Sequence, residues 1–436
     1  MRTGQTAKYL SALGHDVRVV TAARQASEGT DLVLEVPRDH VVYTPWLGSG
    51  IARAVSSREP ASEDGGSAKD GAESARSAVA PPVKRLLRLA QRDLIYMPDD
   101  CVGWYPWAVA ACFRLIRRHP ADLIYASAGP LTSLLVASTV ARLCGVPWVG
   151  ELRDRWSDNH YRELAPWFHR VDVHLEERVL ASARGLVTVS QPWADELERR
   201  YGLPVRAVYN GFEDRDGSAP ILEDGDAETL IVAHLGRLYG GKRDPTPLFR
   251  ALGQLGNDAR HVRVDFYGPE QDIVRRLATA FGVHDYVRVH SDVPYARSLA
   301  VQSAADVLLL LMWNTPAEEG VLPGKLFEYL GARRPVLAVG APKGAAATLI
   351  RDRRFGLASS DPSKIARQLR GWIAEKRARG RLAPLPAEST ADFARSRQVR
   401  HLSEFLGEVY AGRGARRAGD RIQEESRWRP RVRYRD

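Results

Sequence analysis

Short apolar runs and helix-like segments alternate along almost the whole 436-residue chain. This alternation is typical of an α/β fold, because neighbouring parallel strands need a crossover connection, which is usually a helix. A single hydrophobic core stops growing well below this length, so we expect two such domains. The predicted strands are 17–21, 123–126, 148–152, 186–189, 205–209, 230–235, 262–267, 287–290, 307–311 and 335–339.

The two sets of strands are separated by Asn210-Gly211 and an acidic, glycine-containing segment. We therefore predict domains at 1–210 and 227–392, joined by a linker at 211–226. Residues 56–82 are rich in small and charged residues and hold no aromatic, which predicts a disordered insertion. A helix is expected at 393–411, and the Arg-rich segment 412–436 is predicted to be a basic disordered tail.

Composition limits the cellular compartment and the partners that this chain is expected to have. No 18-residue apolar run and no apolar leader are present, and Cys101, Cys112 and Cys144 lack paired spacing, which favours a cytoplasmic protein. The net charge of +10 suggests anionic partners. A basic helical face at 83–94 is explained by an ordinary surface helix, or by contact with an anionic membrane at its inner face. Nucleic acid is the weakest option, because the basic residues gather in the tail.

The start of the chain departs from the usual order of elements. Residues 6–13 indicate a helix and 17–21 the strand after it, whereas doubly wound domains normally begin with a strand. We expect the first strand and its glycine loop to be encoded upstream, and so to be missing from this chain.

The most informative stretch for function is 305–339. A buried strand leads into a Gly/Pro loop and then a helix that opens with Pro323-Gly324-Lys325. Free backbone N–H groups, the helix dipole and a lysine meet at such a point, which favours an anion. Glu328, one turn further, can accept hydrogen bonds from ribose hydroxyls. The pattern predicts a nucleotide-sugar pocket.

Several stretches together resemble glycosyltransferase family 4. They are 14–21, 128–130, 148–156, 209–211, 234–237 with Lys242, and 323–339. The resemblance implies a GT-B architecture: two Rossmann-like domains facing across a cleft, with the acceptor on the amino-terminal side and a UDP- or GDP-sugar on the carboxyl-terminal side. It also implies retention of anomeric configuration without a metal or other cofactor, and a terminal helix that returns to the amino-terminal domain.

The resemblance also implies functions for individual residues. Arg237 and Lys242 would neutralise the leaving diphosphate, although solvent-facing charge is the alternative explanation. Lys325 and Glu328 would hold the donor, with backbone contacts at Gly236, Gly268 and Gly324. The family usually has a further glutamate eight residues before Glu328, where this chain has Gly320; Glu319 lies one place away and is the candidate replacement.

In the amino-terminal half, Asp154 follows a predicted strand and is the candidate to orient the acceptor hydroxyl or take its proton. A structural role is the alternative, since an Arg-Asp pair at a strand end often fixes a loop. His160, His169 and His174 are attributed to packing or the surface. Acidic pairs at 214–216 and 224–226 resemble a metal pattern, but they lie in the predicted linker.

The sequence therefore predicts a retaining glycosyltransferase that moves a sugar to a glycan or lipid-linked acceptor during cell-surface polysaccharide synthesis. Two alternatives remain open at this stage. One is a GT-B sugar-nucleotide epimerase, which would need a pair of acid/base carboxylates. The other is a non-catalytic GT-B partner that binds a nucleotide for another transferase.

Overall fold

The computed structural model describes residues 2–23, 36–46, 97–159, 162, 164–213, 228–313, 315 and 319–416. The predicted insertion at 56–82, the basic helix at 83–94, most of the predicted linker and the tail from 417 onward lie outside this set, as does His160. Contacts group the described chain into two units. The first holds the residues up to Thr188, Ala194–Arg206 and those from Ser403 onward; the second holds Val189–Trp193 and Ala207–Leu402.

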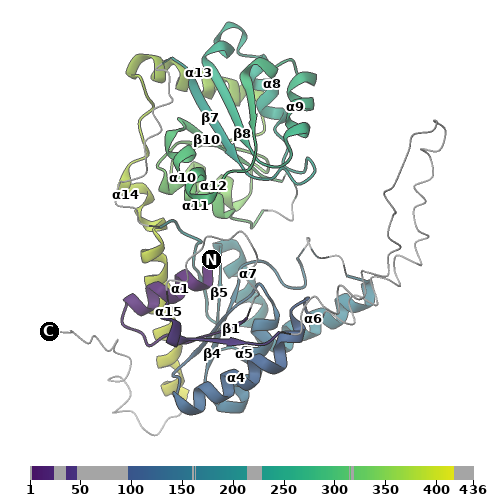
Figure 1. Cartoon of the computed structure of the whole chain (residues 1–436), viewed down its shortest axis with the longest axis vertical. Helices are drawn as coiled ribbons and strands as arrows, with labels where there is room; N and C mark the ends of the chain where they lie inside the picture. Colours follow the sequence, from purple (N-terminus) through teal and green to yellow (C-terminus); the bar gives the residue numbers. More distant parts are fainter. Residues whose placement is uncertain are drawn as a thin grey trace, which may run out of the picture. The chain divides into compact units, whose positions relative to one another are not determined.

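The second unit is built on a six-stranded parallel sheet (Figure 1). Its strand order, β12-β11-β10-β7-β8-β9, is the doubly wound order counted from β7. In this topology the chain leaves in opposite directions from the two central neighbours, β7 and β10, and ligands bind at the carboxyl ends of the strands beside that switch point. The strands are β7 (Leu230–Leu235), β8 (Val262–Tyr267), β9 (Val287–His290), β10 (Val307–Leu311), β11 (Val336–Val339) and β12 (Gly356–Ala358).

Strand β10 shows why the sheet needs helices on both faces. Its five residues are all fully buried; Val307, Leu309 and Leu311 join one hydrophobic cluster, and Leu308 and Leu310 join another. Alternate side chains of a strand point to opposite faces, so an unbroken apolar run needs cover on each side. The helices are α8 (Thr246–Gly253), α9 (Gln271–Ala280), α10 (Tyr295–Ala304), α11 (Gly324–Gly331), α12 (Ala345–Asp352), α13 (Pro362–Arg379) and α14 (Ala387–Thr390).

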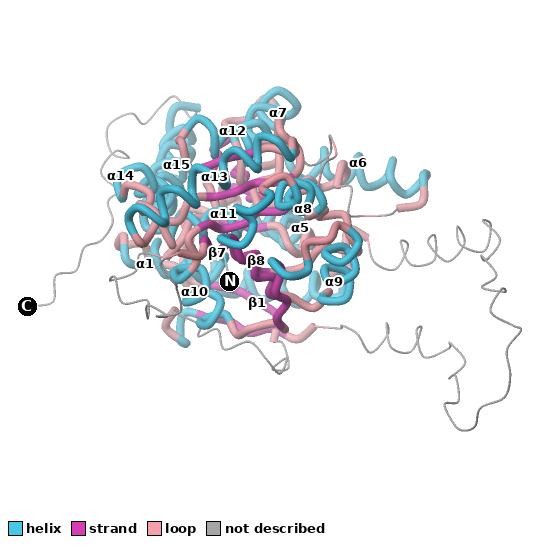
Figure 2. Tube along the Cα trace, turned by 90° about the horizontal axis from the view of Figure 1, so that it is seen from above, coloured by secondary structure: helices cyan, strands magenta, loops and turns pink. Residues whose placement is uncertain are grey.

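Members of α8, α9 and α13 belong to the first cluster, and members of α10, α11 and α12 to the second. Helix α9 lies beside β8 in both views (Figures 1 and 2). The second unit is thus a three-layer α/β/α domain with a core on each side of its sheet.

The first unit contains a four-stranded parallel sheet, β3-β4-β5-β6, and a separate parallel pair, β1-β2. Gly185 opens β5, and a side chain there would meet Phe405 and Val409 of the last helix, α15 (Arg395–Arg416), which thus packs closely on this unit. The other elements are α1 (Arg2–Ala12), β1 (Val19–Ala22), β2 (Val41–Thr44), α4 (Tyr105–Arg118), β3 (Ile124–Ser127), α5 (Thr132–Cys144), β4 (Trp148–Leu152), α6 (Pro166–Leu180), β5 (Gly185–Thr188), α7 (Gln191–Tyr201) and β6 (Val205–Ala207).

The predicted α/β class is confirmed, and every predicted strand is present with ends within two residues of the prediction. Strands β2 and β12 were not predicted, since both are short and β12 has only three residues. Helix α15 continues to Arg416, so the expected helix end at 411 is too early. Among the described residues, no helix has the length and apolarity needed to cross a membrane.

A buried ion pair fixes the amino end of β10. Lys376 Nζ of α13 lies 2.9 and 3.0 Å from the two carboxylate oxygens of Asp306, and Asp306 also accepts the Ile231 N–H at 2.9 Å. Both side chains are 5% exposed. Removing one member of such a pair leaves an uncompensated buried charge, which is costly.

We expect Lys376→Met to lower the free energy of unfolding by about 3–5 kcal/mol, because Asp306 would stay buried without its cation. Urea unfolding followed by circular dichroism measures this loss. Lys364→Met, an exposed position in the same helix, is the matched control and should change stability little. Equal midpoints for the two variants would contradict this account of the ion pair.

Candidate functional site

Three backbone segments meet at the carboxyl ends of β7, β8 and the start of α11. Gly236 has φ 128° and donates its N–H to the Tyr267 carbonyl at 2.7 Å. A Cβ on Gly268 would lie 2.5 Å from the Gly236 oxygen, and a Cβ on Gly236 would lie 1.5 Å from Lys325 Nζ. Only glycine fits at these two positions, so both predicted glycines are needed to bring Lys325 over the end of β7.

Lys325 lies next to a second cation that the sequence analysis missed. Burial and the Arg243 guanidinium lower the pKa of Lys325 to about 8, against the opposing effect of Glu328 and Asp292. Arg243 donates to the Arg237 carbonyl at 3.4 Å and covers the Tyr239 ring, and its Nε is buried without a hydrogen-bond partner. Within the described parts of the chain, neither cation forms an ion pair. Two neighbouring, partly buried cations that form no salt bridge favour an anionic ligand.

Glu328 lies one turn along α11 from Lys325. Its Oε2 accepts a hydrogen bond from Gln302 Nε2 at 3.1 Å, and Gln302, on α10, is 2% exposed. The buried amide therefore fixes the orientation of the carboxylate. Of the two Glu328 oxygens, Oε2 is the one that has a partner among the described residues, which leaves Oε1 available to a ligand hydroxyl.

The loop after β7 is organised by Glu270, which the sequence analysis also missed. Its carboxylate accepts the backbone N–H groups of Leu238, Tyr239 and Gly240, the last two at 3.2 and 2.7 Å. Partial burial raises the pKa of Glu270, but these hydrogen bonds and the charge of Arg237 outweigh it, so the pKa is lowered. Because the Glu270 carboxylate already accepts these three N–H groups, they are not available to a ligand.

Arg237 and Lys242 both have exposed side chains in this loop. Lys242 Nζ lies 4.6 Å from the centre of the Trp313 ring, just after β10, so the lysine reaches across to the neighbouring strand end. Trp313 and Arg243 line a small recess together with Met312, Val321, Pro323, Ala341, Gly344 and Ala346. The structure thus brings Lys242 to the switch point, whereas Arg237 remains a solvent-facing charge beside Glu270.

His234 lies two residues before Gly236 and is buried. Burial and the nearby charge of Lys325 lower its pKa to about 3, so the ring is neutral. Nδ1 lies 2.9 Å from the Leu309 carbonyl, which makes Nδ1 the protonated nitrogen and leaves Nε2 an acceptor. A neutral ring at this place adds no further positive charge beside Lys325.

Glu319 does not join this group among the described residues. Its side chain is exposed, and its carbonyl oxygen accepts the Ala345 N–H at 2.6 Å, which fixes the start of α12. Gly324 is exposed at the first turn of α11, where its N–H lies among the unpaired amides of a helix start. The prediction that Glu319 replaces the glutamate absent at Gly320 stays a prediction.

Asp154 belongs to the first unit and is exposed after β4. Its neighbour Arg153 donates to the Ala128 and Gly129 carbonyls at 2.7 and 3.0 Å, and so fixes the loop after β3. Arg153 thus has the structural role that the sequence suggested as the alternative, which is to fix a loop at the end of a strand. The acceptor role of Asp154 stays a prediction.

One described group could approach a metal ion: Asp99, Asp100 and Cys101. Both Asp99 oxygens already accept hydrogen bonds, Oδ1 from the Thr132 hydroxyl and the Cys101 N–H, and Oδ2 from the Thr132 N–H. Asp99 therefore fixes the start of α5, and the acidic pairs at 214–216 and 224–226 lie outside the described residues.

Comparisons with known proteins agree with this geometry. Residues 1–211 match the family model described as a glycosyl transferase 4-like domain. The 2-deoxystreptamine glucosyltransferase of Streptomyces kanamyceticus is 25% identical over 321 residues, which cover 63% of this chain and 78% of that enzyme.

Among solved structures, sucrose-phosphate synthase from Thermosynechococcus elongatus superposes with a TM-score of 0.57 at 14% identity, covering 94% of this chain and 92% of that one. HepE of Anabaena, in complex with UDP, gives a TM-score of 0.52 at 21% identity over 69% and 82%. The lipopolysaccharide glycosyltransferase WaaG gives 0.50 at 16% identity over 94% and 95%.

The fold is therefore the GT-B fold of glycosyltransferases, with two α/β units. Residues 1–211, just under half of the chain, match the glycosyl transferase 4-like model, and together with the glucosyltransferase relative this match supports a glycosyltransferase enzyme.

Gly236→Ala is expected to weaken nucleoside diphosphate binding at least about tenfold, because its Cβ would collide with Lys325 and its φ of 128° is strained for alanine. Calorimetric titration with UDP and GDP measures the change. Gly253→Ala is the matched control, since nothing lies within 4 Å of its Cβ. Unchanged binding by Gly236→Ala would show that Lys325 does not need its observed position.

Binding should also depend on pH through Lys325. Its pKa of about 8 means that the ammonium loses its proton above pH 8, so affinity for UDP should fall by up to about tenfold between about pH 8 and 9, where the diphosphate itself does not titrate. In Lys325→Met this dependence should vanish and binding should be weaker throughout. A pH profile shared by both proteins would contradict the assignment.

Titration of Lys325 also changes the free energy of unfolding, in a direction that its pKa determines. The pKa of Lys325 is about 8 in the folded chain, below its ordinary value of 10.5, so the unfolded chain binds this proton more tightly. Its contribution therefore makes the unliganded protein more stable as pH rises from about 8 to 10.5.

Proposed function

We propose that the second unit binds a nucleoside diphosphate sugar and that the chain transfers the sugar to an acceptor hydroxyl with retention of configuration. The observation that carries this proposal is the pair of partly buried cations Lys325 and Arg243, which form no salt bridge among the described residues and lie near the oriented carboxylate of Glu328 at the switch point of the sheet. Cations are suited to the diphosphate, and the carboxylate to the ribose hydroxyls.

The proposed role of the cations follows from where negative charge develops during sugar transfer. As the bond from the sugar to the diphosphate breaks, negative charge grows on the leaving phosphate, and Lys325, Arg243 and Lys242 are placed to stabilise it. Because Lys325 and Arg243 are partly buried before the donor arrives, little reorganisation of these two cations is needed at the moment of reaction. Arg237, which is exposed, would contribute on closure around the donor.

A protein nucleophile is not required in this scheme. The acceptor oxygen forms its bond to the anomeric carbon on the face from which the diphosphate leaves, which gives retention, and the departing phosphate oxygen takes the acceptor proton. Asp154 would orient the acceptor hydroxyl. With three cations around the phosphates, the scheme requires no metal or other cofactor.

The relatives indicate the substrates to test first. HepE was solved with UDP, which favours a uridine donor over a guanosine one. One relative is a 2-deoxystreptamine glucosyltransferase and WaaG takes part in lipopolysaccharide biosynthesis, so the acceptor ranges from a small cyclitol to a growing lipid-linked glycan. We place the reaction in the cytoplasm, with cell-surface polysaccharide synthesis and contact with the inner membrane face as the working hypothesis.

Titration with UDP and GDP tests the proposal. One nucleotide should bind, and Glu328→Ala should weaken it about 10–100-fold, the effect of losing hydrogen bonds to a charged group. Glu388→Ala, an exposed glutamate of α14, is the matched control and should bind normally. The proposal fails if neither nucleotide binds the wild-type chain, or if Glu328→Ala binds as tightly as the control.

A further inference from the structure

Two aromatic side chains, Tyr239 and Trp313, connect the loop after β7 to the end of β10. Their ring centroids lie 6.2 Å apart and their planes cross at 70°, so the edge of one ring meets the face of the other. Such a contact is favourable beyond the area that it buries. Tyr239 is 48% exposed, so burial contributes little to its position. We call these two residues the aromatic pair.

Each ring of the aromatic pair lies against one of the cations that are proposed to meet the diphosphate. Lys242 Nζ lies 4.6 Å from the centre of the Trp313 ring, and the Arg243 guanidinium carbon lies 4.6 Å from the centre of the Tyr239 ring. Both distances are within the roughly 6 Å at which a cation is attracted to a ring. Neither cation forms a salt bridge with a described residue. The two rings therefore limit where these cations lie.

The backbone of Tyr239 adopts a conformation that is costly for a residue with a side chain. Its φ is 53°, in the left-handed region. Gly240 and Gly241 follow with φ of 63° and 87°, which cost a glycine little. The Glu270 carboxylate accepts the Tyr239 and Gly240 N–H groups at 3.2 and 2.7 Å and so maintains this turn. Glycine at position 239 would avoid the strain, which indicates that the function lies in the ring.

A ring and a carboxylate position a cation with different consequences. A carboxylate neutralises the cation and competes with an anionic ligand for it. The face of an aromatic ring attracts a cation through its quadrupole, while the ring carries no net charge. A lysine or arginine that is held by a ring therefore keeps its full charge for the ligand.

We propose that Tyr239 and Trp313 are positioning residues, which place Arg243 and Lys242 for the diphosphate without neutralising them. This inference rests on the proposed function, because it concerns how the same donor site obtains its charge. The rings act through the two cations and need no contact with the donor. Loss of a ring should therefore weaken donor binding only while the cation on that ring is present.

A double-mutant cycle between Trp313 and Lys242, measured by calorimetric titration with UDP, tests this inference. Trp313→Leu should weaken UDP binding about five- to tenfold, the magnitude of a partly desolvated cation–π contact. In a Lys242→Met background the same substitution should have little further effect. Trp313→Phe keeps a ring and should bind UDP within about threefold of the wild type.

A second cycle pairs Tyr239 with Arg243. Tyr239→Phe keeps the ring and should bind UDP normally. Tyr239→Asn removes the ring but tolerates the left-handed backbone, so the turn is kept while UDP binding should fall about five- to tenfold. In an Arg243→Met background the asparagine should have little further effect. Thermal melting shows that the variants are folded, and additive losses in both cycles would overturn the inference.

NMR of the unliganded chain separates this inference from the proposed function. An aromatic ring shields protons over its face, so the side-chain methylene signals of Lys242 should lie upfield of those of free lysine. This shift should disappear in Trp313→Leu. Its absence from the wild type would overturn the inference, whether or not UDP binds. An upfield shift in a wild-type chain that binds no UDP would instead refute the proposed function, and with it the role of the aromatic pair in donor binding.

Discussion

The close approach of Gly236, Gly268 and Lys325 is the constraint on which the proposed donor site depends. Parallel pairing of β7 with β8 places the ends of both strands at one edge, and the absence of a side chain on each glycine lets the two backbones touch. Lys325 occupies the space that a Cβ of Gly236 would fill. The ammonium is therefore positioned by packing against backbone rather than by a salt bridge, and its charge remains available for a ligand.

The charged side chains near the two ends of strand β10 are paired differently. Asp306, before the strand, is neutralised by Lys376 within hydrogen-bonding distance and shielded from solvent. At the other end neither Lys325 nor Arg243 forms a salt bridge in the described structure, and burial together with the Arg243 charge lowers the pKa of Lys325 in spite of Glu328 and Asp292. Stability alone would favour compensation at both ends. The uncompensated end is what a site for an anionic substrate requires.

The fold could be predicted from the sequence because each buried strand of a doubly wound sheet is a short, continuous apolar run, as in β7 and β10. The lysine and glutamate of α11 were predictable because they lie at fixed spacing after a Gly/Pro loop. Arg243, Glu270 and Gln302 were not, because their roles come from contacts between residues far apart in the chain, such as Glu270 with the 238–240 amides. The adjacent Lys242-Arg243 pair was the one local signal, and it does not reveal which cation turns toward Lys325.

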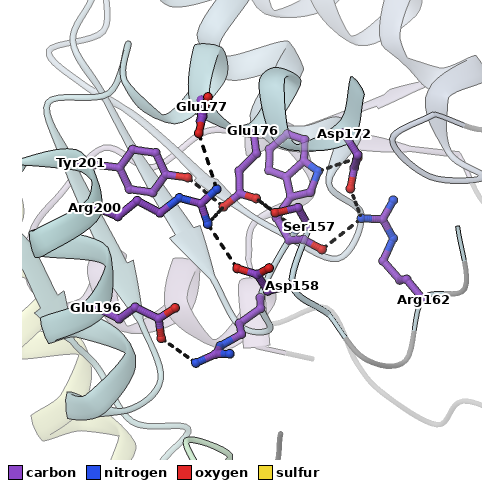
Figure 3. A network of polar contacts seen from close by, with 11 residues as sticks. Ser157, Asp158, Arg162, Asp172, Glu176, Glu177, Glu196, Arg200 and Tyr201 are labelled. Carbon is purple, nitrogen blue, oxygen red and sulfur yellow. Dashed lines mark hydrogen bonds and ion pairs between the residues drawn. The ribbon is translucent and has the colours of Figure 1, made fainter. Parts of the chain in front are cut away.

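The two units use their partly or fully buried charges differently. In the second, neither Lys325 nor Arg243 forms a salt bridge with a described residue, so their charge remains available to a ligand. In the first, the buried carboxylates of Asp172 and Glu176 accept hydrogen bonds from neighbouring groups, so they hold the segment after β4 in place (Figure 3). Buried carboxylates that are fully paired belong to the framework of a fold, whereas partly buried cations without a salt bridge are what the proposed donor site needs.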